Sequence, residues 1–354
     1  MLPLFLVSSH PYTGKNFLTL GLALNLKERG YKIGYIHPAG KLPVKKGKAF
    51  FDEEALFIKE LLELDDPPEV VSPFVYTYDF QYQLFEEGGI RIKERVIEAI
   101  NSLKDRDFVF IVCGDTPFEG YLIDIHPGAL LKEVKGRVLA VQLWRGDTTL
   151  DDLFGLKEIF GKYFLGAVLN KVPVDYYLYV KENMVPFAAS RGLKIFGVFK
   201  KEKALEAVTV KTILEVVNGG IVCGEDKLEE FVENFAVGAM DPENALRYFL
   251  RTPNKAVITG VHRTDIQLLA LETSTKCLLL TGGLVANETV VARAKEKGVP
   301  VIVTSLDTFT VVDKIENLIG RAMIREKTKA IKAKEIVEKE FMMEEFLRLL
   351  EKEA

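Results

Sequence analysis

The chain has 354 residues, which is long enough for two domains with a sizeable core each. Its 48% hydrophobic and 28% charged residues are typical of a globular protein, and its formal net charge of −4 gives no electrostatic case for a nucleic acid or an anionic membrane as a partner. The apolar runs are far shorter than the roughly 20 residues that span a bilayer, and the first residues lack the features of a signal peptide. We therefore expect a cytoplasmic protein without a membrane or nucleic-acid partner.

The first part of the chain alternates predicted strands and helices, which is the pattern of a mainly parallel sheet with helices on both faces. Residues 41–48 are expected to form a basic loop, and residues 72–89 an aromatic and irregular segment. The strands are expected at residues 4–8, 34–38, 108–113, 138–143, 165–169 and 197–199. The helices are expected at residues 14–29, 52–64, 92–103 and 210–217.

A second αβ unit is expected after the double glycine Gly219-Gly220, which is a plausible joint. Its strands are expected at residues 256–259, 277–280 and 301–303, and its helices at 225–235, 242–251, 266–273, 288–297 and 308–319. Residues 321–354 predict a long helix or helix pair whose narrow apolar stripe packs either on its own chain or on a second subunit. The predicted domains are therefore residues 1–217, 218–320 and 321–354.

The stretch from Ser9 to Asn16 has the context of a P-loop, because it joins an apolar strand to a helix and ends in Gly14-Lys15. In such a loop the backbone N–H groups and the helix N-terminus hold phosphates, and Lys15 reaches the terminal ones. Thr13 precedes the glycine. Two consensus residues differ, since Ser9 replaces the first glycine and Asn16 replaces the hydroxyl residue that ligates magnesium. The loop predicts phosphate binding more strongly than hydrolysis.

Three further polar residues follow or begin predicted elements near this loop. Asp115 ends a strongly apolar strand, where it either serves a magnesium ion or caps its own turn. Asn170 also follows a strand and either contacts an adenine edge or forms a turn. Asp52 either binds metal or caps the helix that begins after it. Each of these residues has a structural interpretation that needs no ligand.

Other kinds of site are not indicated. Cys113, Cys223 and Cys277 lie far apart in apolar strands, so we expect them to be buried and reduced. The four histidines show no zinc-binding spacing, and no Gly-x-Ser-x-Gly motif of a serine hydrolase occurs.

The first 215 or so residues resemble the dethiobiotin synthetase-like domain that begins long bacterial phosphotransacetylases, a relative of cobyrinic acid a,c-diamide synthase. The resemblance rests on four stretches: Leu6-Val7-Ser8-Ser9 with Tyr12-Thr13-Gly14-Lys15, Gly34-Tyr35-Ile36-His37-Pro38, Leu169-Asn170-Lys171-Val172-Pro173 and Ile195-Phe196-Gly197-Val198. It implies a P-loop NTPase-like α/β fold that binds ATP or another purine nucleotide. We expect the acetyltransferase part of those enzymes to have no counterpart in this sequence.

Residues 221–320 resemble a DRTGG domain, through Thr259-Gly260-Val261-His262-Arg263-Thr264-Asp265-Ile266 and Leu280-Thr281-Gly282-Gly283. Such domains accompany regulatory units, so the resemblance favours sensing over chemistry. Arg263, Gly282 and Gly283 keep the pattern and either approach a phosphate or only build a tight turn. His262 stands where the pattern has Asp, and any role of that carboxylate is lost.

We expect a nucleotide-binding regulatory protein with a degenerate P-loop, with a link to acetyl-phosphate or acyl metabolism and assembly as a homodimer. One alternative is an ATP-dependent carboxylate-activating ligase of the dethiobiotin or cobyrinate synthase type. A second alternative is a non-catalytic partner protein of a separate acyltransferase. The sequence leaves open whether the protein is an enzyme and whether Mg²⁺ takes part.

Overall fold

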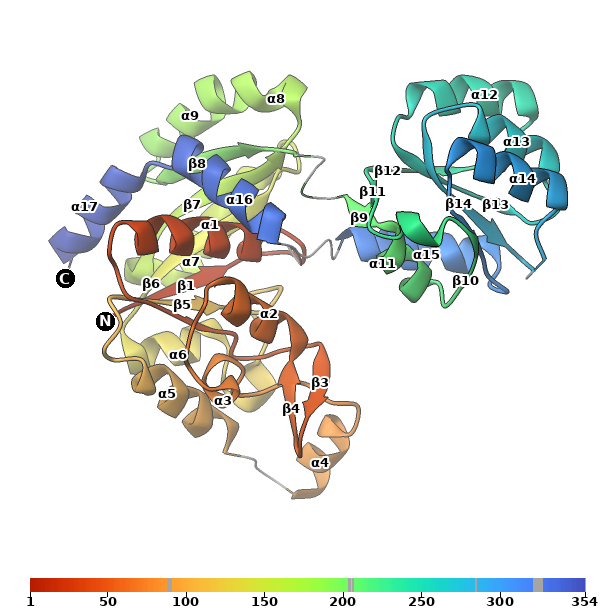
Figure 1. The fold of residues 1–354 in the computed structure, drawn as a ribbon. Coiled ribbons are helices and arrows are strands. Elements are labelled where there is room, and N and C mark those ends of the chain that lie inside the picture. The colour runs from red at the N-terminus through yellow and green to blue at the C-terminus, as the bar shows by residue number, and fades with distance from the viewer. Residues whose placement is uncertain (88–90, 203–204, 206, 284, 321–326, 354) are drawn as a thin grey trace. The chain divides into compact units, whose positions relative to one another are not determined.

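The computed structural model describes residues 1–87, 91–202, 205, 207–283, 285–320 and 327–353, and the chain forms two compact units (Figure 1). The first unit combines Met1–Lys201 with Met323–Ala354, and the second is Glu202–Ala322. Val208, Val210 and Ile213 lie in the core of the second unit, whereas the sequence analysis assigns them to the first domain. None of the helices among the described residues is long and apolar enough to cross a membrane.

The first unit is built on a six-stranded parallel sheet in the order β2-β5-β1-β6-β7-β8, and all six strands were predicted. Their apolar residues are buried on both faces, as the near-continuous apolar runs predict. The P-loop strand β1 lies between β5 and β6. The strands of this sheet are β1 (Leu2–Val7), β2 (Ile33–Ile36), β5 (Phe108–Val112), β6 (Arg137–Leu143), β7 (Phe164–Val172) and β8 (Ile195–Lys200).

Helices cover both faces of this sheet (Figure 1). The helices of the first unit are α1 (Lys15–Glu28), α2 (Glu53–Leu61), α3 (Pro68–Val71), α4 (Phe80–Glu87), α5 (Ile92–Ser102), α6 (Pro127–Val134), α7 (Thr149–Phe160), α8 (Val174–Tyr179), α9 (Val185–Ser190), α16 (Lys327–Glu340) and α17 (Met343–Glu353). Short 3-10 turns occupy Tyr121–Ile123 and Gly161–Tyr163, and a π-helical turn occupies Val180–Met184. Helices α5, α6 and α7 share one core with one face of the sheet, and α1 with α16 lies on the other face.

Two predictions for the first unit were wrong. The expected basic loop at residues 41–48 contains a hairpin of β3 (Pro43–Lys46) and β4 (Ala49–Asp52). Gly47 has a φ of 63° and opens its two-residue turn, the position where such hairpins favour glycine. The segment expected to be irregular ends in helix α4, where Phe80 is buried against Phe74 and Tyr76. Residues 88 and 89 of that segment lie outside the described residues.

The second unit contains a five-stranded sheet in the order β10-β15-β14-β13-β12, in which β10 is antiparallel to β15 and the other pairs are parallel. Gly219 and Gly220, expected as a joint, lie inside this unit, where Gly219 precedes β10 and Gly220 is its first residue. Its strands are β9 (Val208–Thr209), β10 (Gly220–Cys223), β11 (Phe231–Val232), β12 (Asn234–Val237), β13 (Lys255–Gly260), β14 (Thr275–Thr281) and β15 (Val301–Val303). Its helices are α11 (Val210–Val216), α12 (Pro242–Arg251), α13 (Thr264–Leu271), α14 (Glu288–Lys297) and α15 (Thr308–Gly320).

The predicted helix at residues 225–235 was wrong. Only a 3-10 turn at Glu225–Lys227 forms, and the strands β11 and β12 follow it. Strand β11 pairs with β9, and β12 adds a parallel edge strand beside β13. Backbone pairing with strands distant in sequence therefore overrides the local helical pattern.

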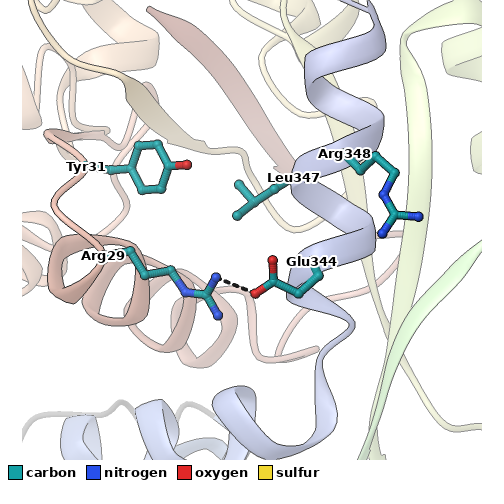
Figure 2. Close-up of a pocket in the computed structure, with 5 residues that line it drawn as sticks. All are labelled: Arg29, Tyr31, Glu344, Leu347 and Arg348. Carbon is teal, nitrogen blue, oxygen red and sulfur yellow. Dashed lines mark hydrogen bonds and ion pairs between the residues drawn. The ribbon is translucent and has the colours of Figure 1, made fainter.

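The C-terminal tail forms a helix pair that packs on the first unit of its own chain, with α16 beside α1 (Figure 1). Gly21 of α1 makes this approach possible, since a Cβ there would lie 2.3 Å from Val337 Cγ2. Beyond the end of α1, a pocket of about 330 Å³ is lined by Arg29, Tyr31 and three residues of α17 (Glu344, Leu347 and Arg348) (Figure 2). Arg29 and Glu344, two of its lining residues, form an ion pair of 2.6 Å. The pocket lies at the opposite end of α1 from the P-loop.

Candidate functional site

The P-loop lies at the carboxyl end of β1, between the ends of β5 and β6. Residues 8–14 form the loop, and α1 begins at Lys15, so the first N–H groups of α1 have no partner within the helix. Gly14 is the N-cap with a φ of 94°, a left-handed conformation that glycine adopts without strain. The edge of an open α/β sheet where the strand order reverses is where ligands of such folds bind.

Lys15 places a buried ammonium group at this loop. Its Nζ donates to Ser8 Oγ at 2.7 Å, and the nearest carboxylate oxygen, Asp115 Oδ1, is 3.9 Å away. Burial lowers the pKa of Lys15, while the charge of Asp115 opposes that shift. The side chain is only 10% exposed. A buried ammonium without a short carboxylate partner retains the capacity to bind a phosphate group.

Asn170 holds the loop from the end of β7. Its Nδ2 donates to the carbonyl oxygen of Thr13 at 2.8 Å, and its Oδ1 accepts from the N–H of Lys171 at 2.9 Å. A Cβ on Gly14 would lie 2.1 Å from Asn170 Nδ2, so glycine is required there. The Thr13 hydroxyl is buried and has no hydrogen-bond partner within the part of the chain that the structure describes. Asn16 lies half-buried at the first turn of α1.

Ser9 belongs to a separate polar network on the β6 side of the loop. Its Oγ donates to Gln142 Oε1 at 2.8 Å and lies 2.7 Å from His10 Nδ1. Gln142 Nε2 donates to Asp152 at 2.7 Å, and Arg145 contacts the His10 ring. The serine that replaces the first glycine of the consensus is thus tied to β6 and α7.

On the β5 side, Asp115 forms a compact ionic cluster with two residues that the sequence analysis did not single out. Lys41 Nζ lies 2.7 Å from Asp115 Oδ2 and 2.8 Å from Glu119 Oε2. Glu119 Oε2 also accepts from the N–H of Asp115 at 2.9 Å. Burial raises the pKa of Asp115, but Lys41 and Lys15 outweigh it, so the pKa lies below its ordinary value. The Asp115 carboxylate is therefore held in its ionised form by the two ammonium groups.

Asp52 is the N-cap of α2 and uses both of its oxygens. Oδ1 accepts from the N–H of Ala55 at 2.9 Å and lies 3.3 Å from His37 Nδ1, while Oδ2 accepts from the N–H groups of Lys41 and Leu42 at 2.8 and 2.9 Å. Burial raises its pKa, but His37 and the backbone donors lower it to about 2. Asp52 therefore fixes the backbone that carries Lys41.

The P-loop fold implies a magnesium ion, and the residues present do not fit one. Asn16 lacks the hydroxyl ligand, and the ammonium of Lys41 already bridges Asp115 and Glu119. His37, Asp52 and Glu54 bring three ligand atoms within 4.8 Å of one another, but the Asp52 oxygens are the helix cap just described. One buried acceptor, Glu119 Oε1, has no partner among the described residues.

The remaining predicted residues lie in the second unit. Arg263 donates through Nε and Nη2 to the two carboxylate oxygens of Asp265, at 3.0 Å each, and through Nη2 to the Met240 carbonyl at 3.1 Å. Gly282 has a φ of 76°, and its N–H donates to the Leu306 carbonyl. The N–H of Gly283 donates to the Thr304 carbonyl. These contacts match the tight-turn interpretation of the glycines, and the ligand roles of the three residues stay a prediction.

The residues Ser8, Lys41, Glu119 and Gln142 were missed by sequence reasoning. Lys41 was noted only as part of a basic run. The sequence feature that could have marked it is its position directly after Gly40. A Cβ on Gly40 would lie 2.3 Å from the Asp52 side chain, which ties this turn to the site. Glu119 stands four residues after Asp115, a spacing that carries no signal without the fold.

Part of the chain matches a known protein family. Residues 212–318 match the DRTGG domain family. The chain contains a DRTGG domain. Its fold is that of a P-loop NTPase-like α/β domain joined to this DRTGG domain, with a helical tail.

Two curated relatives match parts of the chain. The uncharacterized protein YtoI of Bacillus subtilis is 30% identical over 126 residues, which cover 36% of this chain and 28% of YtoI. The ATP-dependent dethiobiotin synthetase BioD of Caldicellulosiruptor bescii is 28% identical over 72 residues, which cover 20% of this chain and 30% of BioD. The chain thus matches less than a third of the length of either relative. The expected relationship to phosphotransacetylases stays a prediction.

Two solved structures show a low level of structural similarity to this chain. The cell division ATPase MinD of Pyrococcus furiosus has a TM-score of 0.36 at 19% identity, covering 58% of this chain and 85% of that one. The CBS and DRTGG domains of a Clostridium perfringens pyrophosphatase, complexed with diadenosine tetraphosphate, have a TM-score of 0.27 at 20% identity, covering 45% and 74%. Because both TM-scores are below 0.5, the fold assignment rests on the strand order and the P-loop itself.

Proposed function

We propose that this protein is a nucleotide-binding regulatory protein in which the P-loop binds the phosphates of ATP or another purine nucleotide. The observation that carries this proposal is Lys15, a buried ammonium at the N-terminus of α1 that has a hydroxyl partner but, among the described residues, no carboxylate closer than 3.9 Å. The surrounding donors favour an anion, because the first N–H groups of α1 point out of the helix. The unpartnered hydroxyl of Thr13 supplies another donor at the loop.

Regulation rather than turnover is supported by the consensus differences and by the DRTGG domain. Asn16 offers no hydroxyl for magnesium, and Asp115 is already engaged with Lys41. A link to acyl-phosphate metabolism, a homodimeric state and a cytoplasmic location belong to the same proposal and rest on the sequence resemblance and composition alone.

Calorimetric titration with ATP and with ADP, each in Mg²⁺ and in EDTA, tests the proposal. We expect binding by the wild-type protein without phosphate release, and a loss of at least ~10-fold in affinity for Lys15→Ala. The matched control is Lys46→Ala, an exposed lysine on β3 that should bind like wild type. No binding at millimolar nucleotide, or a Lys15→Ala variant with wild-type affinity, would overturn the assignment. Stoichiometric phosphate release would instead favour the ATP-dependent ligase.

A further inference from the structure

In the cluster of Lys41, Asp115 and Glu119, the ammonium group of Lys41 is the cation that pairs with the two carboxylates. The ammonium of Lys41 lies 2.7 Å from Asp115 and 2.8 Å from Glu119. The other oxygen of Asp115 faces Lys15 at 3.9 Å, so two ammonium groups bracket one carboxylate. The serine hydroxyl that Lys15 contacts also donates to the carbonyl oxygen of Asp115 at 3.0 Å. The cluster and the P-loop therefore form one connected structure.

The position of Lys41 is fixed by its backbone. Its N–H donates to the buried carboxylate of Asp52 at 2.8 Å, as does the N–H of Leu42. The preceding residue, Gly40, donates to the Phe74 carbonyl at 3.0 Å and accepts from the N–H of Tyr76 at 2.8 Å. Lys41 is thus held beside the P-loop by four hydrogen bonds around one turn. An ordinary solvated lysine has no such anchoring.

The charges in this cluster balance without a metal ion. The formal charges of its two lysines and two acidic residues sum to zero, so the charge that a P-loop site otherwise takes from magnesium is carried by Lys41. A divalent ion in the same place would have to displace this ammonium, and magnesium requires near-octahedral oxygen ligands. The side chain of Lys41 is 45% exposed and remains reachable by a ligand.

We propose that Lys41 is a built-in counterion that lets this P-loop bind nucleotide phosphates in their magnesium-free form. This inference rests on the proposed function and specifies the ionic form of its ligand. It also assigns Lys41 a positioning role, because the ammonium offsets part of the negative charge of Asp115 and Glu119, which otherwise repels the phosphates. Removing that ammonium leaves two carboxylates that repel free nucleotide and are open to a metal ion.

The test is calorimetric titration of the full chain with ATP in EDTA and in excess Mg²⁺. We expect wild type to bind at least as tightly in EDTA as in Mg²⁺. Lys41→Met keeps the length of the side chain without its charge, and we expect it to lose at least ~10-fold in affinity in EDTA and to regain part of that loss in Mg²⁺. Lys46→Met on the same hairpin is the matched control and should behave like wild type. Trp144, the one tryptophan of the chain, reports by its fluorescence whether each variant is folded.

Two further measurements keep the inference separable from misfolding. Lys41→Arg retains a cation and should keep most of the affinity in EDTA. Mn²⁺ titration followed by electron paramagnetic resonance, in the presence of ATP, should show a protein-dependent metal site in Lys41→Met and none in wild type. Wild-type binding that is ~10-fold or more tighter in Mg²⁺, or Lys41→Met binding like wild type in EDTA, would overturn the inference while the proposed function stands. Absence of wild-type binding under both conditions would overturn the proposed function itself.

Discussion

The buried carboxylate of Asp52 connects three parts of the site. It caps α2 through the N–H of Ala55, it holds the turn before Lys41, and it pairs with His37. Its side chain is only 1% exposed, so an unpaired charge there would be strongly destabilising. Four partners instead stabilise the ionised form. The sequence offered metal binding and helix capping as alternatives, and the geometry is that of a cap.

Asp52→Asn should therefore destabilise the first unit in a pH-dependent way. The pKa of Asp52 is about 2 in the folded protein against an ordinary value of 3.8, a difference that corresponds to about 2 kcal/mol. Because the folded pKa is the lower one, this contribution is complete above about pH 4 and is lost as the pH falls toward 2. Urea unfolding followed by Trp144 fluorescence should show the difference between wild type and variant at pH 7 and its decline below pH 4. The exposed Asp105→Asn is the control, and a difference that stays constant with pH would contradict the prediction.

Asn170 offers a second prediction at this scale, because it donates to the P-loop carbonyl of Thr13 and fills the space above Gly14. Asn170→Ala leaves that carbonyl without its donor, a loss of about 1–3 kcal/mol, and frees the loop to move. We expect nucleotide affinity to fall by ~10-fold or more in calorimetry. Asn183→Ala, an exposed position, should leave the affinity unchanged. Equal affinities of the two variants would show that Asn170 does not position the loop.

The site residues that could be predicted from the sequence are those marked by their immediate sequence neighbours. Lys15 and Gly14 stand in a motif, and Asp115 and Asn170 follow apolar strands. The partners of these residues come from distant parts of the chain, since the Lys41–Asp115 contact joins residues 74 positions apart and the Ser9–Gln142 contact joins residues 133 positions apart. No pattern within a single element encodes such pairs, so they become visible only in the folded sheet.

At the scale of elements, the approach of α16 to α1 depends on the absence of a side chain at Gly21. A Cβ there would lie 2.3 Å from Val337 Cγ2 and 3.0 Å from the Ala333 carbonyl oxygen. Asn25, one turn later, donates through one amide nitrogen to the carbonyls of Gly21 and Lys334, at 2.7 and 3.0 Å. An ion pair of 2.6 Å between Lys334 and Glu28 continues the contact. The helix that begins at the P-loop is thus fixed along its length by the tail.

Gly21→Ala should destabilise the first unit even though alanine is the better helix former. The intrinsic gain of about 1 kcal/mol is set against overpacking, which costs about 1–3 kcal/mol. Val337→Ala removes the nearest clashing atom, Cγ2, but keeps the Cβ at 2.8 Å and the Ala333 carbonyl oxygen at 3.0 Å, so the double variant should lose less stability than the sum of the single variants. Unfolding followed by Trp144 fluorescence gives the free energy of unfolding of wild type, the two single variants and the double variant. Strict additivity would mean that the two helices do not meet as described.

The strands that are buried on both faces were the ones that could be predicted from the sequence. The six strands of the first sheet and the three central strands of the second have apolar runs that indicate them directly. The hairpin of β3 and β4 was missed because its residues are mostly exposed, and its pairing depends on the turn at Gly47. Strands β10 and β12 form the edges of the second sheet, where backbone pairing rather than burial decides the structure.

At the scale of the whole molecule, the first unit is discontinuous in sequence. The chain leaves it after β8, forms the second unit, and returns with α16 and α17. The returning segment joins the sheet edge closely, since Met342 donates to the Phe196 carbonyl at 2.8 Å and the Phe341 and Phe346 rings pack on Phe196. Both ends of the DRTGG unit are therefore joined to the P-loop unit, one through β8 and the other through the helix that packs on α1. The chain that returns from the DRTGG unit thus continues into α16, the helix that packs on α1.

A chain that ends after Ala322 should consequently lose the fold of the first unit and retain that of the second. Within its described residues 327–350, the tail buries seven apolar side chains (Ala330, Ala333, Val337, Phe341, Met343, Phe346 and Leu350). At about 1.5–3 kcal/mol for each of the larger ones, their loss is comparable to the 5–15 kcal/mol stability of a typical domain. We expect unfolded Trp144 emission at 25 °C in the truncated chain, together with a remaining cooperative circular-dichroism transition from the DRTGG unit.

A peptide of residues 323–354 added in trans should restore native emission, whereas the same peptide with Val337 and Phe346 changed to Asp should not. Native emission without any peptide would mean that the tail is dispensable for the fold of the P-loop unit.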